Sequence, residues 1–437
     1  MSPDRPRSRR RIFIGGLALL LLTVGGAAAA YVLVSDRDVS NPDVEFRPEP
    51  TQTPVPDPAV EPKKGEKDPL DDFVWAQYGY SKDRRRYLPA SRSLRPPFWR
   101  KWSVTGKILL EFAPVIGGRS LYLLKNNGAV YAIAKKTGRV RWKRKMGYLA
   151  AASPAYAHGR VFVTVLKRSR RTNAGRVAAL SAEDGRVLWS KPLPSRSESS
   201  PLIDNGRLYF GTENGTVYAL RARNGEVRWT YRAAGAVKGG LALANGKLYF
   251  GDYGGRVQAV RQRDGVRVWS TSTRGSRFGT AAGNFYSTPA VAFSRVYIGN
   301  TDGNVYSFAS SNGKLAWRKG TGGYVYASPA VAQAPGGKPS VYIGSYDGNF
   351  YSLDARSGRV LWRHRAGGKI SGGATVIGDI VYFSNLSAKS TTGLGARTGR
   401  KVFSFGRGAF NPAVSDGRML FVTGYSSLYG LKVKRAR

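Results

Sequence analysis

The chain has 437 residues, no cysteine and a formal net charge of +43. Without cysteine it can form no disulfide, thiolate metal site, thiol nucleophile or lipid-modified N-terminal cysteine. The charge is unevenly distributed: residues 73–437 carry 60 basic and 15 acidic side chains, whereas residues 35–72 carry five basic and eleven acidic ones. A polycationic folded part of this kind would attract anionic polymers, phospholipid headgroups or acidic proteins.

The N-terminal segment has the pattern of a membrane anchor. Residues 1–11 contain five arginines, and residues 12–34 form an uncharged, largely apolar run. A run of this length can cross a hydrocarbon layer of about 30 Å as one helix, and the positive residues stay on the cytoplasmic side. The sequence predicts a basic cytoplasmic segment (1–11) and a single transmembrane signal-anchor helix (12–34) in the cell membrane. The rest of the chain is expected on the extracytoplasmic side.

The mode of export stays open. Residues 8–13 resemble a twin-arginine export signal, and Ala28–Ala30 has the small side chains of a signal-peptide cleavage site. Against cleavage, residues 31–34 continue the apolar run beyond that site. Retention of the anchor is the favoured interpretation, and both alternatives predict export.

Residues 35–72 form an acidic linker with eight prolines and no strand pattern. A segment with so few apolar side chains cannot bury enough surface to offset its ordering entropy, so we predict disorder with polyproline-like stiffness. An alternative is that the acidic linker folds back over the basic part of the chain and masks it.

An aromatic residue recurs through the rest of the chain at intervals of 40 to 48 residues. The repeated positions are Trp102, Trp142, Trp189, Trp229, Trp269, Trp317 and Trp362, followed by Phe403 at an eighth position. A turn dipeptide ending in glycine stands four residues before nearly every one of them, such as Gly138 before Trp142. We expect these eight side chains to dock neighbouring structural repeats against one another.

Each repeat has the pattern of four short strands. Residues 200–203, 207–210, 216–220 and 226–229 alternate with Asn-Gly dipeptides, which allow the positive φ angles of tight hairpin turns. A four-stranded unit of about 40–45 residues is typical of a β-propeller blade, which must stack against its neighbours to bury both faces.

The two ends of the repeat region predict how the ring closes. Residues 411–434 supply three strands without a tryptophan, and residues 98–102 supply a single tryptophan strand with nothing before it. The first strand is expected to complete the last blade, which removes free sheet edges at the junction. The predicted fold is therefore an all-β, eight-bladed propeller of four-stranded antiparallel blades over residues 98–437, with a lead-in segment at 73–97.

These repeats resemble the pyrroloquinoline-quinone (PQQ) repeat, as in Gly303-Asn-Val-Tyr-Ser-Phe308 followed by Asn312-Gly-Lys-Leu-Ala-Trp317. The lead-in, from Trp75-Ala-Gln-Tyr-Gly-Tyr80 to Pro89, looks like the segment that enters the propeller in that superfamily. The resemblance implies the propeller fold but leaves function open, because the superfamily includes quinoprotein alcohol dehydrogenases, BamB-like assembly scaffolds and extracellular sensor domains.

The resemblance to dehydrogenases implies a quinone and a calcium ion on the propeller axis, with Glu and Asn ligands, a carboxylate base and often adjacent cysteines. This chain lacks the cysteines, and most acidic residues of the propeller stand in turns, where aspartate is common. A few acids have no such role, and they include Glu111, Glu198, Asp252, Asp354 and Asp379. His158 precedes Gly159 in a predicted blade turn, and His364 lies beside Trp362 on a predicted outer strand, so both are expected to be structural. We predict no catalytic residue, no metal site and no cofactor.

The residues that lead into the inner strands should surround a central funnel. Those selected as a binding rim are Tyr148, Arg196, Lys238, Tyr286, Tyr324, Tyr326, Lys369 and Arg407, with Glu198 and Phe410 beside them. Two insertions, residues 166–173 and 271–287, fall on the same face, and insertions often mark the functional side of a repeat fold. Cations combined with rigid aromatics suit an anionic or carbohydrate-like ligand or an acidic peptide.

The favoured function is a non-catalytic binding or assembly scaffold for envelope proteins or anionic envelope polymers. A PQQ- and calcium-dependent dehydrogenase is the second hypothesis, and an extracellular ligand-sensing domain is the third, although no output module accompanies it. Outer-membrane assembly itself is disfavoured because BamB-like scaffolds are usually lipoproteins and the required cysteine is absent. The predicted topology excludes nucleic acid, and the oligomeric state stays open.

Overall fold

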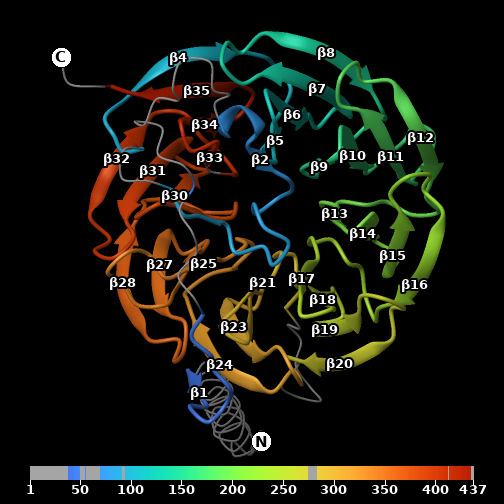
Figure 1. The fold of residues 1–437 in the computed structure, drawn as a ribbon. Coiled ribbons are helices and arrows are strands. Elements are labelled where there is room, and N and C mark those ends of the chain that lie inside the picture. The colour runs from blue at the N-terminus through green and yellow to red at the C-terminus, as the bar shows by residue number, and fades with distance from the viewer. Residues whose placement is uncertain are drawn as a thin grey trace, which may run out of the picture. The chain divides into compact units, whose positions relative to one another are not determined.

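The computed structural model describes residues 38–49, 55, 69–90, 94–273, 283–411 and 413–434. Two compact units divide the chain, Met1–Val39 and Ser40–Arg437, and the second contains eight sheets arranged around a central axis (Figure 1). The predicted all-β propeller with eight four-stranded blades is confirmed. Among the described residues, no helix has the length and apolar character needed to cross a membrane, and the anchor predicted at 12–34 lies outside them.

The blades follow one another in chain order, and each runs from an inner to an outer strand. Blade 1 consists of β5 (Val115–Gly117), β6 (Ser120–Leu124), β7 (Ala129–Ala134) and β8 (Val140–Lys145). Blade 2 consists of β9 (Ala155–Ala157), β10 (Arg160–Val165), β11 (Arg176–Ser181) and β12 (Val187–Pro192). Blade 3 consists of β13 (Leu202–Asp204), β14 (Arg207–Gly211), β15 (Thr216–Arg221) and β16 (Val227–Arg232). Blade 4 consists of β17 (Ala242–Ala244), β18 (Lys247–Gly251), β19 (Arg256–Arg261) and β20 (Arg267–Ser272). Blade 5 consists of β21 (Ala290–Ala292), β22 (Arg295–Gly299), β23 (Asn304–Ala309) and β24 (Leu315–Gly320). Blade 6 consists of β25 (Ala330–Ala332), β26 (Ser340–Gly344), β27 (Asn349–Asp354) and β28 (Val360–Arg365). Blade 7 consists of β29 (Thr375–Ile377), β30 (Ile380–Asn385), β31 (Ser390–Gly395) and β32 (Lys401–Phe405), and blade 8 of β33 (Ala413–Ser415), β34 (Met419–Thr423), β35 (Leu428–Val433) and β4 (Phe98–Val104).

Burial within a blade follows the position of the strand. In blade 3, β14 and β15 are buried at nearly every position, whereas β16 is exposed or half-buried along its length. The middle strands are covered on both faces by neighbouring blades, and only the outer strand can alternate polar and apolar residues. The turn before β14 has Asn205 and Gly206 at φ of 44° and 69°, the conformation that a two-residue hairpin requires.

The first strand of the propeller closes the ring. β4 pairs antiparallel with β35, and Trp102 lies opposite Gly430. A Cβ on Gly430 would lie 2.2 Å from Trp102 Cε2, so only glycine leaves room for the indole there. The prediction that residues 98–102 complete the last blade is confirmed.

Every repeated tryptophan contacts the following blade. Each indole Nε1–H donates to a backbone carbonyl there at 2.9 to 3.1 Å: Trp102 to Lys135, Trp142 to Ala182, Trp189 to Ala222, Trp229 to Gln262, Trp269 to Ser310, Trp317 to Ala355, and Trp362 to Ala396. At the eighth position, Phe403 packs edge-on against Phe98 of β4, with ring centroids 5.5 Å apart. The aromatic series therefore joins each blade to the next.

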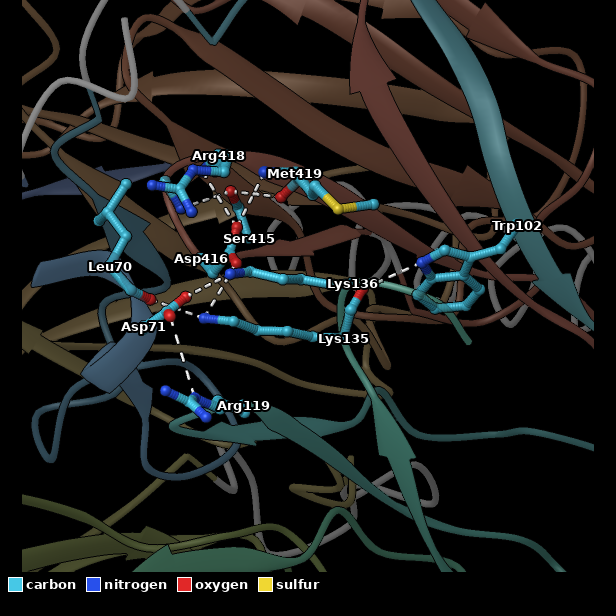
Figure 2. A network of polar contacts seen from close by, with 11 residues as sticks. Leu70, Asp71, Trp102, Arg119, Lys135, Lys136, Ser415, Asp416, Arg418 and Met419 are labelled. Atoms are coloured by element: carbon cyan, nitrogen blue, oxygen red, sulfur yellow. Dashed lines mark hydrogen bonds and ion pairs between the residues drawn. The ribbon is translucent and has the colours of Figure 1, made fainter. Parts of the chain in front are cut away.

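A buried ion pair reinforces the junction between blades 8 and 1 (Figure 2). Lys135 Nζ lies 3.1 Å from Asp416 Oδ2, and the two side chains are 1% and 3% exposed. Lys135 Nζ also donates to the carbonyl of Leu70, in the short 3-10 helix η1 (Pro69–Asp72), at 2.6 Å. Because the Lys135 carbonyl accepts the Trp102 indole N–H, this residue links the end of the acidic linker, the first blade and the last blade.

The lead-in contains a segment, residues 74–88, that we name the strap because it runs past the inner strands of seven blades. It begins with β2 (Val74–Trp75), which pairs with β5, and ends with β3 (Tyr87–Leu88), which pairs parallel to β29. Between them, strap oxygens accept the N–H of the middle residue of an inner strand at 2.7 to 3.0 Å: Ala76 from Tyr156, Gln77 from Ile203, Lys82 from Leu243, Asp83 from Val291, and Arg85 from Val331. Inner strands are sheet edges with unpaired donors, and the strap accepts one such donor from each of these five strands.

Arg84 lies at the centre of the strap and is fully buried. Its guanidinium donates to the carbonyls of Leu241 (2.8 Å), Ser200 (3.1 Å), Pro201 (3.2 Å) and Tyr78. Burial, with a smaller contribution from nearby Arg86, lowers the pKa of Arg84 to about 9. The strap thus ties blades 3 and 4 together through one side chain.

The prediction of disorder is wrong for part of the acidic linker. After β1 (Val39–Ser40), Asn41 bonds the Leu315 and Ala316 carbonyls of β24 at 2.8 and 2.7 Å. Val44 is 5% exposed, and Phe46 stacks on Phe293 with ring centroids 5.3 Å apart. These apolar side chains anchor residues 40–49 on blade 5. The prediction of disorder rested on the average composition of the linker, which is acidic and rich in proline, and so it missed these few apolar residues.

Acidic linker residues also contact cations of the propeller unit. Glu49 pairs with Arg85 of the strap, and Asp71 lies 2.9 Å from Lys136 Nζ. A hydrogen bond from Lys136 holds the pKa of Asp71 below its usual value. In the part that the structure describes, the linker therefore folds back and pairs with a few of the basic side chains.

Candidate functional site

A hollow of about 450 Å³, open solvent included, lies where the inner strands begin, and we name it the funnel. Residues leading into the inner strands of seven blades line it, and Tyr78 of the strap lies among them. The lining residues are Tyr78, Glu111, Phe112, Glu198, Ser200, Lys238, Gly239, Gly240, Tyr286, Thr288, Tyr326, Ser328, Ser371, Gly372, Gly373, Phe410 and Asn411. The strap passes the same inner strands and so limits how far the funnel continues along the axis.

One wall of the funnel is an alternating chain of acids and bases. Lys238 Nζ lies 3.0 Å from Glu198 Oε1 and 2.9 Å from Glu213 Oε1. Arg196 Nε lies 3.2 Å from the other oxygen of Glu213, and the Tyr286 hydroxyl donates to Glu198 Oε2 at 3.1 Å. Two carboxylates and two cations therefore neutralise one another within this wall.

Burial shifts the protonation of this wall. Burial raises the pKa of Glu198, and neighbouring Glu213 adds to the rise while Lys238 opposes it. Burial also raises the pKa of Tyr286 well above its usual value, with Glu198 contributing in the same direction. Tyr253, whose ring lies 5.3 Å from Lys238 Nζ, has its pKa raised by burial to about 12. These tyrosines stay neutral hydrogen-bond donors across the physiological range.

The adjoining wall is a cluster of tyrosines. Tyr326 lies between Tyr286, Tyr324 and Tyr346, with ring centroids 5.9, 6.0 and 4.9 Å away. Lys369 Nζ lies 5.4 Å from the centroid of Tyr346, within the range of a cation–π contact. Tyr324 is 56% exposed, so this cluster presents aromatic surface and hydroxyl groups to an incoming ligand.

The wall opposite belongs to blades 8 and 1. Asn126 Nδ2 donates to Glu111 Oε2 at 2.9 Å, and the Tyr78 hydroxyl donates to Asn411 Oδ1 at 3.1 Å. Burial raises the pKa of Glu111, and the hydrogen bond from Asn126 partly opposes this rise. A peptide backbone or a hydroxylated ligand could exchange hydrogen bonds with these groups.

The structure brings part of the predicted rim together. Lys238, Tyr286 and Tyr326 line the funnel. Tyr324 and Lys369 join it through the tyrosine cluster, and Arg196 joins it through Glu213.

Two predicted rim residues lie outside the funnel lining. Tyr148 is 42% exposed and lies under Arg170, whose guanidinium carbon is 5.5 Å from the ring centroid. Arg407 is exposed and donates to the carbonyl of neighbouring Gly406 at 3.1 Å. In the predicted insertion at 271–287, residues 274–282 lie outside the described part of the chain.

Sequence reasoning missed residues from the turns between second and third strands. Asn126, Glu213, Tyr253 and Tyr346 each stand two positions before the glycine of such a turn, and all four contact groups of the funnel walls. This repeated position was visible in the sequence and could have identified them. Tyr78 gave no comparable signal, because only the path of the strap places it in the funnel.

Comparison with known proteins supports the repeat assignment. A family model described as "Outer membrane protein assembly factor BamB" matches residues 96–192, 173–405 and 326–435. The chain belongs to the BamB-like PQQ-repeat family. A search of curated protein sequences found no match for this BamB-like chain.

Solved structures share the architecture of this BamB-like propeller at low sequence identity. BamB from Moraxella catarrhalis is 17% identical with a TM-score of 0.62, and the match covers 78% of this chain and 99% of that one. A quinohemoprotein alcohol dehydrogenase from Pseudomonas putida HK5 is 14% identical with a TM-score of 0.68, covering 84% and 82%. A europium-containing methanol dehydrogenase is 13% identical with a TM-score of 0.68, covering 83% and 99%. Such likeness shows the fold alone and does not decide between binding and catalysis.

The funnel of this BamB-like chain does not fit a quinone held by a metal ion. A hard cation requires several oxygen ligands that converge on one point. Among the described residues, no group of three or more His, Asp or Glu side chains could hold a metal ion. The carboxylates present are already engaged, Glu198 by Lys238 and Tyr286, and Glu111 by Asn126. Their donor set suits recognition of a polar ligand better than coordination of a cation.

Proposed function

We propose that this chain is a non-catalytic binding scaffold whose funnel receives a segment of an envelope protein outside the cytoplasm. The observation that supports this proposal is the combination of an internally neutralised wall with an adjoining tyrosine cluster. Tyrosine provides large, rigid contact area and a hydrogen-bonding hydroxyl at low entropic cost, which is why it is enriched at protein recognition sites.

The charge of the funnel favours a polypeptide segment. Lys238 and Arg196 are paired with Glu198 and Glu213, so the wall has little net charge to attract a polyanion. Side chains of a partner would pack on Tyr326 and Tyr346, and its backbone amides would meet the hydroxyl and carboxylate groups.

We also propose that the propeller is tethered to the cell membrane by residues 12–34 and lies on the extracytoplasmic side. Support comes from the uncharged run and from the five arginines that precede it. Cell fractionation tests this anchor: the full chain should remain with membranes after carbonate washing, and deletion of residues 2–34 should abolish membrane retention. Recovery of the full chain in the soluble fraction would contradict it.

Photocrosslinking in intact cells tests the binding function. A photoreactive phenylalanine at Tyr326 should give a discrete crosslinked protein, whereas the same probe at Asn312, an exposed turn residue, should not. Adding Tyr346→Ala should abolish the product. The matched control is Tyr425→Ala, since Lys389 lies 5.0 Å from the ring of Tyr425 much as Lys369 lies over Tyr346, but Tyr425 does not line the funnel. Equal crosslinking from both probe positions, or indifference to Tyr346→Ala, would refute the proposal.

A further inference from the structure

The outer strands of the propeller have an unusual charge composition. On the seven blades other than blade 5, these strands are β4, β8, β12, β16, β20, β28 and β32. Together they carry thirteen lysines and arginines and no aspartate or glutamate. We name this surface the belt, and each of the seven strands contributes at least one cation to it.

The belt cations are accessible. Twelve of the thirteen side chains are exposed, and Lys191 is half-buried. Among the ion pairs between described residues, one involves a belt cation, Arg228 with Glu226 at 3.4 Å. In the part of the linker that the structure describes, Glu49 and Asp71 pair with cations outside the belt, Arg85 and Lys136. On blade 5 the situation differs, because Asn41 occupies the edge of β24.

Protection against aggregation does not explain this composition. Charged side chains on an exposed sheet edge prevent it from pairing with another strand, and the outer strands are such edges. That function is served by charges of either sign, and oppositely charged neighbours would stabilise the blade surface. Thirteen cations without a single carboxylate instead maximise the positive potential around the ring, at a cost in mutual repulsion.

Blades 8 and 1 together carry six of the thirteen belt cations, more than any other two neighbouring blades. β4 contributes Arg100 and Lys101, and β8 contributes four cations within six residues, including Arg141 and Lys143. At about 3.3 Å per residue, four charges occupy a strand of roughly 20 Å. Trp99 on β4 is 46% exposed beside them. Arginine and lysine side chains at this density would replace the counterions of a phosphate-bearing polymer.

We propose that the belt binds a flexible linear polymer that carries phosphate groups along its length. The arrangement of the cations favours a linear polymer over a lipid surface, because the cations lie on seven blades around a closed ring (Figure 1). A flat bilayer touches the convex outside of a ring at only one or two blades, whereas a flexible chain can follow successive outer strands. This binding surface is separate from the funnel and does not depend on its function.

Salt-dependent binding of inorganic polyphosphate by the purified full-length chain tests this proposal. A chain of about 100 phosphates, labelled at one end, is titrated by fluorescence anisotropy at several NaCl concentrations. We expect affinity to fall steeply with salt, because each phosphate contact releases condensed counterions. Monomeric phosphate should bind at least 100-fold more weakly than the polymer. Absence of polymer binding, or binding that does not respond to salt, would overturn the proposal.

Two variants with the same loss of charge localise the site. In the belt variant, Arg100, Lys101, Arg141 and Lys143 are replaced by glutamine. In the control variant, four exposed cations from turns outside the belt are replaced by glutamine: Arg223, Lys314, Arg356 and Arg397. The slope of log K against log salt concentration should decrease by about 3 for the belt variant, at about 0.7 per lost contact. For the control variant it should change by less than about 1.

Binding to lipid vesicles distinguishes the polymer from a membrane, and a second belt variant guards against misfolding. Binding to vesicles with anionic phospholipid, after subtraction of binding to neutral phosphatidylcholine vesicles through residues 12–34, should be at least tenfold weaker than binding to the polymer, per accessible phosphate. Tighter binding to vesicles would replace the polymer with a lipid surface. A second belt variant on other blades, with Arg232, Arg267, Arg363 and Arg365 changed to glutamine, should reproduce the loss independently of the fold of blades 8 and 1. Equal weakening by the control variant and both belt variants would refute the belt as the binding surface.

Discussion

Substitution of the glycine beneath Trp317 tests how the blades are joined. Gly358 has φ of +76°, and a Cβ there would lie 2.7 Å from Trp317 Cδ2 and 2.8 Å from Cε3. Alanine at this position must adopt a left-handed conformation, which costs about 1–2 kcal/mol. It must also displace a fully buried indole, which adds about 1–3 kcal/mol of overpacking.

Gly159 provides a matched control. Its φ is +69°, close to that of Gly358, but a Cβ there would meet no atom within 4 Å. Gly159→Ala should therefore incur only the conformational cost of about 1–2 kcal/mol. The difference between the two alanine variants isolates the contact between the turn and the tryptophan, which we expect to be about 1–3 kcal/mol.

Equilibrium urea denaturation, followed by tryptophan fluorescence and far-ultraviolet circular dichroism, measures both variants. In a Trp317→Leu background the extra penalty of Gly358→Ala should disappear, because the indole that it displaces is gone. Equal destabilisation by Gly358→Ala and Gly159→Ala, or an unchanged penalty in the Trp317→Leu background, would refute the proposed contact between turn and ring.

Three further substitutions test the closure of the ring and the strap. Lys135→Met leaves the buried Asp416 carboxylate without its ammonium partner and should cost about 3–5 kcal/mol of unfolding free energy; a cost below about 1 kcal/mol in urea denaturation would contradict this. Because Lys136 lowers the pKa of Asp71 below 3.8, the ionised Asp71 stabilises the fold above that pH, and the stabilisation is lost as pH falls through the lowered pKa. Asp71→Asn should therefore reduce stability at pH 7 by less than about 1 kcal/mol, and thermal melts should show this effect shrinking as the pH falls below 3.8. A pH-independent effect would exclude the ion pair as its cause. Arg84→Lys removes most of the charge-assisted hydrogen bonds to strap and blade carbonyls, at about 1.5–3 kcal/mol each, so an unchanged denaturation midpoint would show that they contribute nothing.

The fold was predictable because it repeats. Trp142, Trp189 and Trp229 recur at near-constant intervals after equivalent turns, and local propensity and burial agree in each unit. The pairing of residues 98–102 with the last three strands could also be anticipated, since an incomplete first repeat and an incomplete last repeat require each other.

The funnel was only partly predictable. Position relative to an inner strand was sufficient to select Lys238, Tyr286 and Tyr326, which share that position in successive blades. It also selected Tyr148 and Arg407, which do not line the hollow. Sequence position determines which strand end a residue precedes, but the direction of each loop depends on packing against its neighbours.

By itself, the amino-acid sequence determined the number of blades, the strand order, the closure of the ring and the positive charge of the propeller. These follow from local turn chemistry and from a periodic pattern of aromatic residues. The tertiary structure alone decided the course of the strap, the docking of residues 40–49 and the mutual neutralisation of the funnel acids. These contacts join residues far apart in the chain, such as Arg84 with Leu241 and Arg295 with Val44, and each depends on the particular surface that the folded blades present rather than on a repeated pattern.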